Sequence, residues 1–292
     1  MERLYGTGRG KSKRINSIAM NEIIFLLDKD NACQTRYLNG ILLILDENLS
    51  EYSIIVTADF HNLPTTKYRK IVLFVGEDGE CYDPHPYSSY PDVIAVFRFY
   101  GVEKRCDYKY TFPIPIGYNC RSNGKEMIRM YPEKKLSERK FDVFYSGQVL
   151  ECRKKLVDRL TSLSSSFNIY SQSNPAFRRG MDIDDYYRFM GDSKICVSPD
   201  GASVETFRFV EACGSGCIVI TTPKPDLWYY RNAPVFFIND WSELTGELLH
   251  RILSMDFDFL QEKIREYYSV FLSEEAVAIY IIKIIWMKSQ EN

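Results

Sequence analysis

The stretch SPDGASVETFRFVEACGSGCIVI, Ser198–Ile220, decides how this chain is organised. A turn of small and polar residues leads into a short helix, and an apolar β-branched run follows it. Glu205, Arg208 and Glu211 recur at three-residue spacing, so on one helix they lie within about 120° of one another. The three charges are either a solvated face of ion pairs or a set that holds something charged.

The ends of this expected helix can be assigned from residue type. Ser203 is the expected N-cap, and Gly214 is the expected residue after the last turn. The helix then lies between two apolar runs, KICVSP before it and CIVITT after it. A strand, a helix and a second strand in this order are typical of a parallel α/β unit.

Apolar runs with polar ends repeat along the rest of the chain. Continuous β-branched runs of this kind indicate buried parallel strands, with room between them for crossover helices. Four lie before residue 101, at Glu22–Asp28, Tyr52–Asp59, Lys70–Asp78 and Asp92–Tyr100. The pattern restarts at KFDVFYSGQ and continues through FNIYS, KICVSP, CIVITT and PVFFIND. The sequence therefore predicts two successive Rossmann-like units.

A charged segment without sustained apolar runs separates the two units. In doubly wound sheets ligands bind at the carboxyl ends of the strands, so a cleft between the two units is the expected site. The C-terminal helix can return to the first unit. The predicted division is a flexible basic tail over 1–20, an N-terminal Rossmann-like domain over 21–125, a linker over 126–140, a C-terminal Rossmann-like domain over 141–275 and a final helix over 276–292 that packs back on the first domain.

The composition excludes several classes of protein. The net charge is −2, which argues against bulk binding of nucleic acid. Eight cysteines form no CxxC pair and only three histidines are present, which argues against a zinc site. No segment approaches the roughly 18 apolar residues of a membrane span. We predict a cytoplasmic protein, with weak peripheral binding to an anionic membrane through the basic N-terminus as the alternative.

The turn and the helix start together suit an anionic ligand. Small residues in SPDGAS allow close approach to the backbone, and a helix N-terminus offers free N–H groups and a partial positive charge. Arg208, one turn into the helix, can form a bidentate contact with phosphate. Glu211 suits a pair of ribose hydroxyls, as an acidic residue does in other nucleotide sites.

This region resembles exostosin-like glycosyltransferases of family 47. SKICVSPDGASVETFRFVEACGSGCIVI is similar to their nucleotide-sugar segment, FYSGQVLECRKKL to their FxGxxxxxxR opening, and PVFFINDWSEL to a later segment. The resemblance implies an α/β GT-B fold, two Rossmann-like domains with a cleft between them, and no metal requirement. The chain departs from the family at Val219, where proline is usual. Ser203 also stands eight residues before Glu211, where many GT-B enzymes carry an acid, so Glu205 either substitutes or pairs with Arg208.

Further donor-site residues follow from the same resemblance. Gly147 and Gln148 lie on the first strand–helix turn, and Arg153 is either a phosphate ligand or a structural arginine. Tyr170 and Ser171 end a strand, where the tyrosine either stacks on a nucleobase or belongs to the core. The full predicted donor-binding set is Gly147, Gln148, Arg153, Ser198, Pro199, Gly201, Ser203, Glu205, Arg208 and Glu211.

The N-terminal unit is expected to supply the acceptor side. Glu77 lies just beyond a buried strand in a loop similar to the GEN loop of α1,3-fucosyltransferases, whose glutamate is the proposed base. A carboxylate in a closing cleft can deprotonate an acceptor hydroxyl. The competing interpretation is an ordinary solvated turn. Other acceptor-side candidates are Asp59, His61, Asp78 and His85.

Metal binding is not expected. Of the Asp-x-Asp pairs, only Asp28/Asp30 follows a strand and could ligate a divalent metal. Asp182/Asp184 and Asp256/Asp258 fall at expected helix starts, where carboxylates favour the helix dipole.

The predicted activity is transfer of a hexosyl or pentosyl group from a nucleotide sugar, with a UDP- or GDP-sugar expected. The acceptor is the hydroxyl of a saccharide, glycolipid or glycoprotein, as in polysaccharide biosynthesis, and the displacement is inverting and metal-independent. One alternative is a non-catalytic, exostosin-like saccharide-binding or scaffold partner. A second is a nucleotide-sugar epimerase of the same fold.

Overall fold

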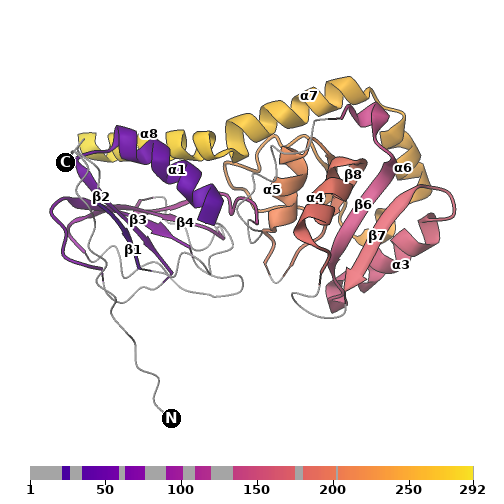
Figure 1. Cartoon of the computed structure of the whole chain (residues 1–292), viewed down its shortest axis with the longest axis horizontal. Helices are drawn as coiled ribbons and strands as arrows, with labels where there is room; N and C mark the ends of the chain where they lie inside the picture. The colour runs from indigo at the N-terminus through magenta and orange to yellow at the C-terminus, as the bar shows by residue number, and fades with distance from the viewer. Residues whose placement is uncertain are drawn as a thin grey trace, which may run out of the picture.

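A computed structural model shows two parallel β-sheets of five strands each, formed by successive parts of the chain (Figure 1). It describes residues 22–26, 35–58, 63–75, 90–100, 109–119, 134–174, 180–201 and 203–291. Every strand pair in both sheets is parallel. The fold class is therefore α/β, as the apolar runs predicted.

The strands of the first sheet lie side by side in chain order. Its central strands are buried along their length, which explains why the runs are continuously apolar instead of alternating. The strands are β1 (Glu22–Phe25), β2 (Tyr52–Thr57), β3 (Arg69–Phe74), β4 (Val93–Arg98) and β5 (Thr111–Pro113). Helix α1 (Thr35–Asn48) joins β1 to β2 and packs on this sheet.

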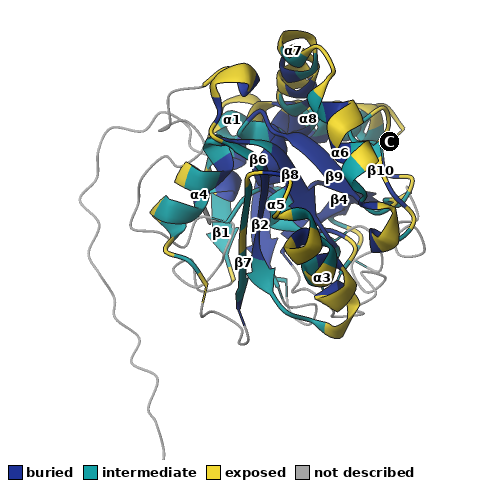
Figure 2. Cartoon of the chain, turned by 90° about the vertical axis from the view of Figure 1, so that its right-hand side faces the viewer, coloured by how far each residue is buried: buried dark blue, intermediate teal, exposed yellow. Residues whose placement is uncertain are grey.

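The second sheet has the order β10-β9-β8-β6-β7, and its inner strands β8 and β9 are buried almost along their whole length, whereas the edge strands β7 and β10 are more exposed (Figure 2). Its strands are β6 (Phe141–Gln148), β7 (Ile169–Asn174), β8 (Ser193–Ser198), β9 (Ile218–Thr221) and β10 (Phe236–Phe237). Its α-helices are α3 (Lys154–Leu163), α4 (Ile183–Gly191), α5 (Phe207–Gly214), α6 (Gly246–Leu253) and α7 (Phe257–Tyr267). Short 3₁₀ turns span Leu136–Glu138, Glu151–Arg153 and Trp241–Glu243.

The strand order reverses at β6 and β8. From β6 the chain goes to β7 on one side, and it then returns to β8 on the other side of β6. Such a reversal places two loops on opposite faces and opens a crevice at the carboxyl ends of the two strands. The residues after β6 and β8 are therefore the first place to look for a ligand site.

The last helix, α8 (Glu274–Gln290), returns to the first sheet and lies beside α1 (Figure 1). Its side chains Val277, Ala278, Ile281 and Ile285 are buried in the core of that sheet. It begins two residues earlier than expected and follows a single π-helical turn at Tyr268–Leu272. Among the described residues, no helix is long and apolar enough to cross a membrane.

Side-chain hydrogen bonds join the two halves where the chain crosses. Tyr37 donates to the carbonyl of Leu272 at 2.7 Å. Trp228, in the second half, donates from its indole N–H to the carbonyl of Pro113 at 2.8 Å and stacks on Tyr280 of α8 at 4.2 Å. The carboxyl end of β5 is therefore tied directly to the second half.

Helix α5 differs from its expected bounds at both ends. It begins at Phe207, because Thr206 is extended and the preceding Ser203 accepts a hydrogen bond from the N–H of Glu205. Ser203 is thus part of the turn and not the N-cap. At the other end Gly216, with φ +65°, takes the left-handed position of a Schellman motif, with bonds from Gly216 to Cys213 and from Cys217 to Ala212. Gly214 is the last helical residue.

Gly117 lies against the ring of Tyr37, so a substitution there tests the packing at the junction between the two halves. Its φ is +73°, and a Cβ there would lie 2.2 Å from Cδ1 of the Tyr37 ring. We predict that Gly117→Ala lowers the free energy of unfolding by about 2 kcal/mol or more, through strain and overpacking. The matched control is Gly246→Ala at the start of α6, where the nearest atom is 3.6 Å away. It should be neutral or stabilising by up to about 1 kcal/mol. Urea denaturation measures both, and equal effects would contradict the account.

Candidate anion-binding site

Two arginines meet at the carboxyl ends of β6 and β8. Arg153, from the 3₁₀ turn after β6, donates from Nε to the carbonyl of Asp200 at 2.8 Å and from Nη1 to the carbonyl of Gln148 at 3.3 Å. Arg208, in the first turn of α5, donates to the carbonyl of Ser146. Both side chains are therefore held by backbone carbonyls of the strand ends.

The electrostatics of this pair are unusual because the buried Arg153 lies beside a second guanidinium of the same charge, that of the partly buried Arg208. Arg153 is only 7% exposed. Burial, and then the charge of Arg208, lower the pKa of Arg153. No described carboxylate lies within ion-pair distance of either guanidinium. Buried charges are normally paired, so this arrangement favours an anion from outside the chain.

Two polar atoms beside the pair are buried without a hydrogen-bond partner among the described residues. They are Nε of Arg208 and the hydroxyl of Tyr145, whose ring lies 5.3 Å from the Arg208 guanidinium carbon. Gly147 completes the cradle, because a Cβ there would come within 2.9 Å of Arg208 Nη2 and 3.2 Å of the Tyr145 hydroxyl. A glycine at this position lets the guanidinium lie against the backbone.

The start of α5 adds a second source of positive potential. Thr206 is its N-cap residue but makes no side-chain capping bond, since its hydroxyl pairs with that of Ser198 at 3.2 Å. Uncapped N–H groups at a helix start favour anions. Arg208 projects from this same turn, so the helix start and the arginine pair face one region.

A buried lysine, Lys224, holds the loop that leads into α5 in place. Lys224, whose side chain is 1% exposed, forms an ion pair with Asp200 at 2.6 Å and donates to the carbonyl of Val204 at 2.7 Å. Burial lowers the pKa of Lys224, while Asp200 raises it. Because the Asp200 carbonyl also receives Arg153, this ion pair fixes the position of the arginine.

Glu205 is not on the face of α5. It precedes the helix, is 2% exposed, and accepts from the hydroxyl of Tyr229 at 2.6 Å and that of Tyr230 at 3.4 Å. The expected three-charge face is therefore divided. Arg208 and Glu211 belong to the helix, and Glu205 anchors the preceding loop to the segment after β9.

Glu211 lies on α5 but is enclosed by protein. It is 2% exposed, and Oε1 accepts from the backbone N–H of Asn119 at 3.0 Å and from Tyr187 at 2.9 Å. Oε2 accepts from Tyr186 at 2.8 Å. Asn119 belongs to the segment after β5, so this carboxylate joins α4 and α5 to the first half of the chain.

The remaining predicted positions divide into two groups. Ser198, Pro199, Gly201 and Gln148 lie at the strand ends beside the arginines, whereas Tyr170 stacks on Phe189 at 4.0 Å in the core, the alternative left open for it. Outside the described residues lie Asp28, Asp30, Asp59, His61, Glu77, Asp78 and His85.

Several site residues were missed by sequence reasoning. Lys224, Tyr186 and Tyr187 belong to no motif, and Tyr145 lies in FYSGQVLECRKKL at a position that the motif does not specify, so only tertiary neighbours identify these residues. The two other Asp-x-Asp pairs do lie at helix starts, as expected. Asp182 accepts from the N–H of Asp184 and Asp256 from that of Phe259. No group of three metal-ligating side chains occurs among the described residues.

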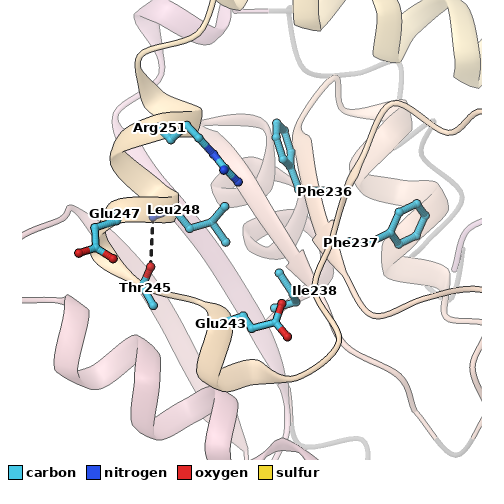
Figure 3. A pocket seen from close by; sticks show the side chains of 8 residues that line it. All are labelled: Phe236, Phe237, Ile238, Glu243, Thr245, Glu247, Leu248 and Arg251. Carbon is cyan, nitrogen blue, oxygen red and sulfur yellow. Dashed lines mark hydrogen bonds between the residues drawn. The ribbon is translucent and has the colours of Figure 1, made fainter.

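One hollow among the described residues lies away from the arginine pair. It measures about 370 Å³ and lies between β10 and α6, where Arg251 and Phe236 form one end and Glu243 the other (Figure 3). The Thr245 hydroxyl at its side caps the N–H of Leu248. The smaller hollow, about 190 Å³, is lined by Cys152, Pro199, Asp200, Thr222, Asn239, Asp240 and Trp241. Since Asp200 receives Arg153, this smaller hollow adjoins the arginine pair.

Comparison with known structures shows the fold. The chain is similar to AviGT4, a glycosyltransferase involved in avilamycin A biosynthesis (8% identity, 92% of this chain and 98% of that one, TM-score 0.56). It is also similar to an α-glucosyltransferase solved with UDP and a 13-mer DNA that contains a central A:G mismatch. The identity is 10%, the match covers 87% of this chain and 83% of that one, and the TM-score is 0.51. A third similar structure is a glycosyltransferase from Rickettsia africae, with 14% identity over 88% of this chain and 82% of that one and a TM-score of 0.50. The chain therefore has the α/β GT-B fold.

Comparison by sequence adds no family. A scan against protein-family models and a search of curated proteins both find no match. The resemblance to the exostosin-like family thus stays a prediction, whereas the GT-B fold that it implied is confirmed.

The buried carboxylate of Glu211 gives a pH-dependent prediction. Burial raises its pKa above the ordinary 4.5, although its hydrogen bonds oppose the shift. A raised native pKa contributes stability below about pH 4.5 that is lost as pH rises through the native value. Relative to Glu211→Gln, the wild type should therefore lose stability across that window. Thermal unfolding from pH 4 to 8 measures the difference, and a difference that does not change with pH would contradict this prediction.

Glu211→Ala should be destabilised by about 1–3 kcal/mol relative to the wild type, since it leaves the buried donors of Asn119, Tyr186 and Tyr187 unpaired.

Proposed function

We propose that this protein is a glycosyltransferase that takes its sugar from a nucleoside-diphosphate sugar. The observation that supports this most is the pair formed by the buried Arg153 and the partly buried Arg208, which lies at the switch point of the second sheet and has no carboxylate within ion-pair distance among the described residues. A diphosphate supplies the missing negative charge and accepts bidentate hydrogen bonds from guanidinium groups. Ligands of doubly wound sheets bind in the crevice at the carboxyl ends of the strands, which is where this pair lies.

The proposed donor geometry follows the residues around the pair. The diphosphate lies between Arg153 and Arg208, with the start of α5 facing it and the Tyr145 hydroxyl available as a further donor. Gly147 leaves room for this approach. The hollow lined by Cys152 and Asp200 gives space beside the diphosphate for another part of the donor. The sequence favours a UDP- or GDP-sugar.

Glu211 has a different role in this proposal from the ribose contact predicted from its spacing. Its exposure is small, and both oxygens accept hydrogen bonds from protein groups. We assign it a positioning role, in which it fixes α5, and hence Arg208, relative to the segment after β5. Glu205 likewise acts through the loop by its bonds to Tyr229 and Tyr230.

The proposed reaction is a single displacement. The acceptor hydroxyl oxygen bonds to the anomeric carbon, the bond from that carbon to the diphosphate oxygen breaks, and the hydroxyl proton passes to a base. The two arginines and the helix start stabilise the charge that develops on the leaving diphosphate, without a metal. Glu77 is the proposed base on sequence grounds, and the acceptor is a saccharide or glycoconjugate. The epimerase alternative would turn over donor without acceptor.

Nucleotide binding tests the arginine pair directly. A thermal-shift panel of UDP-, GDP-, CMP- and dTDP-sugars should show stabilisation by a UDP- or GDP-sugar. Arg153→Gln and Arg208→Gln should each weaken binding by about tenfold or more, since each removes a charged contact to phosphate. The ligand-free variants should keep their stability within about 1 kcal/mol, because relief of like-charge burial offsets the lost hydrogen bonds.

Arg188→Gln is the matched control, because this arginine is exposed on α4 and forms an ion pair with Asp185 of its own helix, away from the arginine pair. It should bind nucleotide sugar as the wild type does. No stabilisation by any of the four classes at millimolar ligand would count against the proposal.

Turnover tests the proposed base. Glu77→Gln should keep the nucleotide-induced thermal shift and lose about 10²–10⁴-fold in transfer rate, the range for removal of a general base. Asp258→Asn, an exposed carboxylate in the first turn of α7, is the control and should retain activity within about tenfold. Binding of a nucleotide sugar with no transfer in the wild type, to any saccharide acceptor tried, would favour the non-catalytic saccharide-binding alternative.

A further inference from the structure

The smaller hollow, of about 190 Å³, lies at the carboxyl edge of the second sheet. Its lining comes from the segments that follow the four strands β6, β8, β9 and β10. In order along the chain the lining residues are Cys152, Pro199, Asp200, Thr222, Asn239, Asp240 and Trp241. Ligands of doubly wound sheets bind at this edge, so the hollow has the position of a binding site.

The hollow shares residues with the arginine pair. Cys152 immediately precedes Arg153, and the carbonyl of Asp200 accepts from Nε of Arg153 at 2.8 Å. On the proposed function, on which this inference rests, a diphosphate lies between Arg153 and Arg208. One of its two substituents, the sugar or the nucleoside, then lies beside the hollow. The lining of the hollow indicates which of the two it is.

Two carboxylates line the hollow, and protein contacts use only one oxygen of each. Asp200 accepts through Oδ1 from Thr222 at 2.9 Å and from Lys224 at 2.6 Å. Asp240 also accepts through Oδ1, from Lys155. In the part of the chain that the structure describes, neither Oδ2 accepts a hydrogen bond. The ion pairs therefore hold both side chains in place and leave one acceptor on each.

Hydrogen-bond donors line the same hollow. Trp241 is only 6% exposed, and its indole N–H has no hydrogen-bond partner among the described residues. A buried donor without a partner favours a ligand, because such groups are normally hydrogen-bonded. The side-chain amide of Asn239 is exposed and can donate as well as accept. Donors and acceptors around one hollow match a ring that carries several hydroxyl groups, since each hydroxyl can do both.

The size and charge of the hollow separate the possible occupants. Pockets for drug-sized ligands measure about 300–1,000 Å³, so a hollow of about 190 Å³ suits a single ring better than the two or three rings of a nucleoside. The free oxygens of Asp200 and Asp240 accept from neutral hydroxyl groups. They would repel the carboxylate of a hexuronic acid, because like charges placed together reject a ligand.

We propose that this hollow holds the sugar of the donor and selects a neutral hexose over a hexuronic acid. The hydroxyl groups of the hexose donate to the free oxygens of Asp200 and Asp240. They accept from the amide of Asn239 and the indole N–H of Trp241. The nucleoside extends from the arginine pair away from the hollow.

The thiol of Cys152 reports whether the hollow is occupied, because it is exposed and lines the hollow. The full chain is labelled with N-ethylmaleimide, and mass spectrometry of the peptide that contains Cys152 gives the rate. UDP is compared with UDP-glucose and UDP-galactose, and GDP with GDP-mannose. At a saturating concentration, the nucleotide sugar that binds should slow labelling by about tenfold or more relative to its free nucleotide. UDP or GDP alone should leave the rate within about twofold of the ligand-free rate, because the hollow stays open.

A variant tests the polar lining and leaves the arginines in place. Asn239→Leu keeps the size of the side chain and removes its amide. It should weaken binding of the nucleotide sugar about fivefold to tenfold, as for the loss of one hydrogen bond, and leave binding of the free nucleotide unchanged. The matched control is Asn48→Leu, at an exposed position of α1 on the first sheet, which should bind both ligands as the wild type does. Isothermal titration calorimetry measures these affinities.

The charge of the sugar is tested on the wild type with the corresponding uronic acid donor. UDP-glucuronic acid or GDP-mannuronic acid should bind at least about tenfold more weakly than the neutral nucleotide sugar of the same base. The free nucleotide is the reference, because it shares the diphosphate and the base but has no sugar to place in the hollow.

Three results would overturn the proposal. One is equal labelling of Cys152 in the presence of a nucleotide and of its hexose derivative, when both bind. Another is an equal effect of Asn239→Leu on the free nucleotide and on the nucleotide sugar. The third is a uronic acid donor that binds as tightly as the neutral one. In all three cases a nucleotide still binds, so the proposed function stands. If neither UDP nor GDP nor their sugars bind, the proposed function fails, and this proposal fails with it.

Discussion

The arrangement around the second sheet depends on two guanidinium groups that are held close together with little exposure. Like charges in such a place raise the free energy of the empty protein, and the chain keeps them there with backbone carbonyls at the ends of β6 and β8. The neighbouring residues serve this arrangement. Gly147 gives the space, and the Lys224–Asp200 ion pair fixes the carbonyl that receives Arg153. The strain is understandable if an anion completes the site.

The same helix that carries Arg208 also joins the two halves of the chain. Glu211 binds the backbone of Asn119 after β5, and Trp228 binds Pro113 at the end of β5. The first sheet is thus connected to the arginine pair through one turn of α5. The π-helical turn before α8 provides the other connection, where Tyr37 binds the carbonyl of Leu272. These contacts offer a physical route by which binding on one half can affect the position of the other.

The fold was largely predictable because strands that are buried on both faces leave continuous apolar runs in the sequence. The short strand β5 was not predicted, because three residues that end at Pro113 form no such apolar run. The expected strand PVFFIND shortens to Phe236–Phe237 for a related reason, because it is the edge strand and has one neighbour only. The start of α5 was misplaced because Ser203 has the right residue type for a cap, but its local turn takes it out of the helix.

The candidate site was predictable only in part. Arg153 and Gly147 were predicted from the first strand–helix turn, and Arg208 from its place one turn into the helix; the structure brings the three together, although Gly147 lies within β6 and not on the turn. The burial of Glu205 and Glu211 could not be found, because their partners are tyrosines on other segments and single tyrosines carry no motif. Lys224 was missed for the same reason. Helical spacing placed three charges on one face, whereas tertiary contacts gave each of them a separate environment.

A crystal structure of the protein with UDP or GDP bound tests the central claim most directly. The account predicts that the β-phosphate oxygens lie within about 2.7–3.2 Å of nitrogen atoms of both Arg153 and Arg208, at the start of α5. A nucleotide bound elsewhere, such as the hollow between β10 and α6, with the arginine pair unchanged, would contradict it.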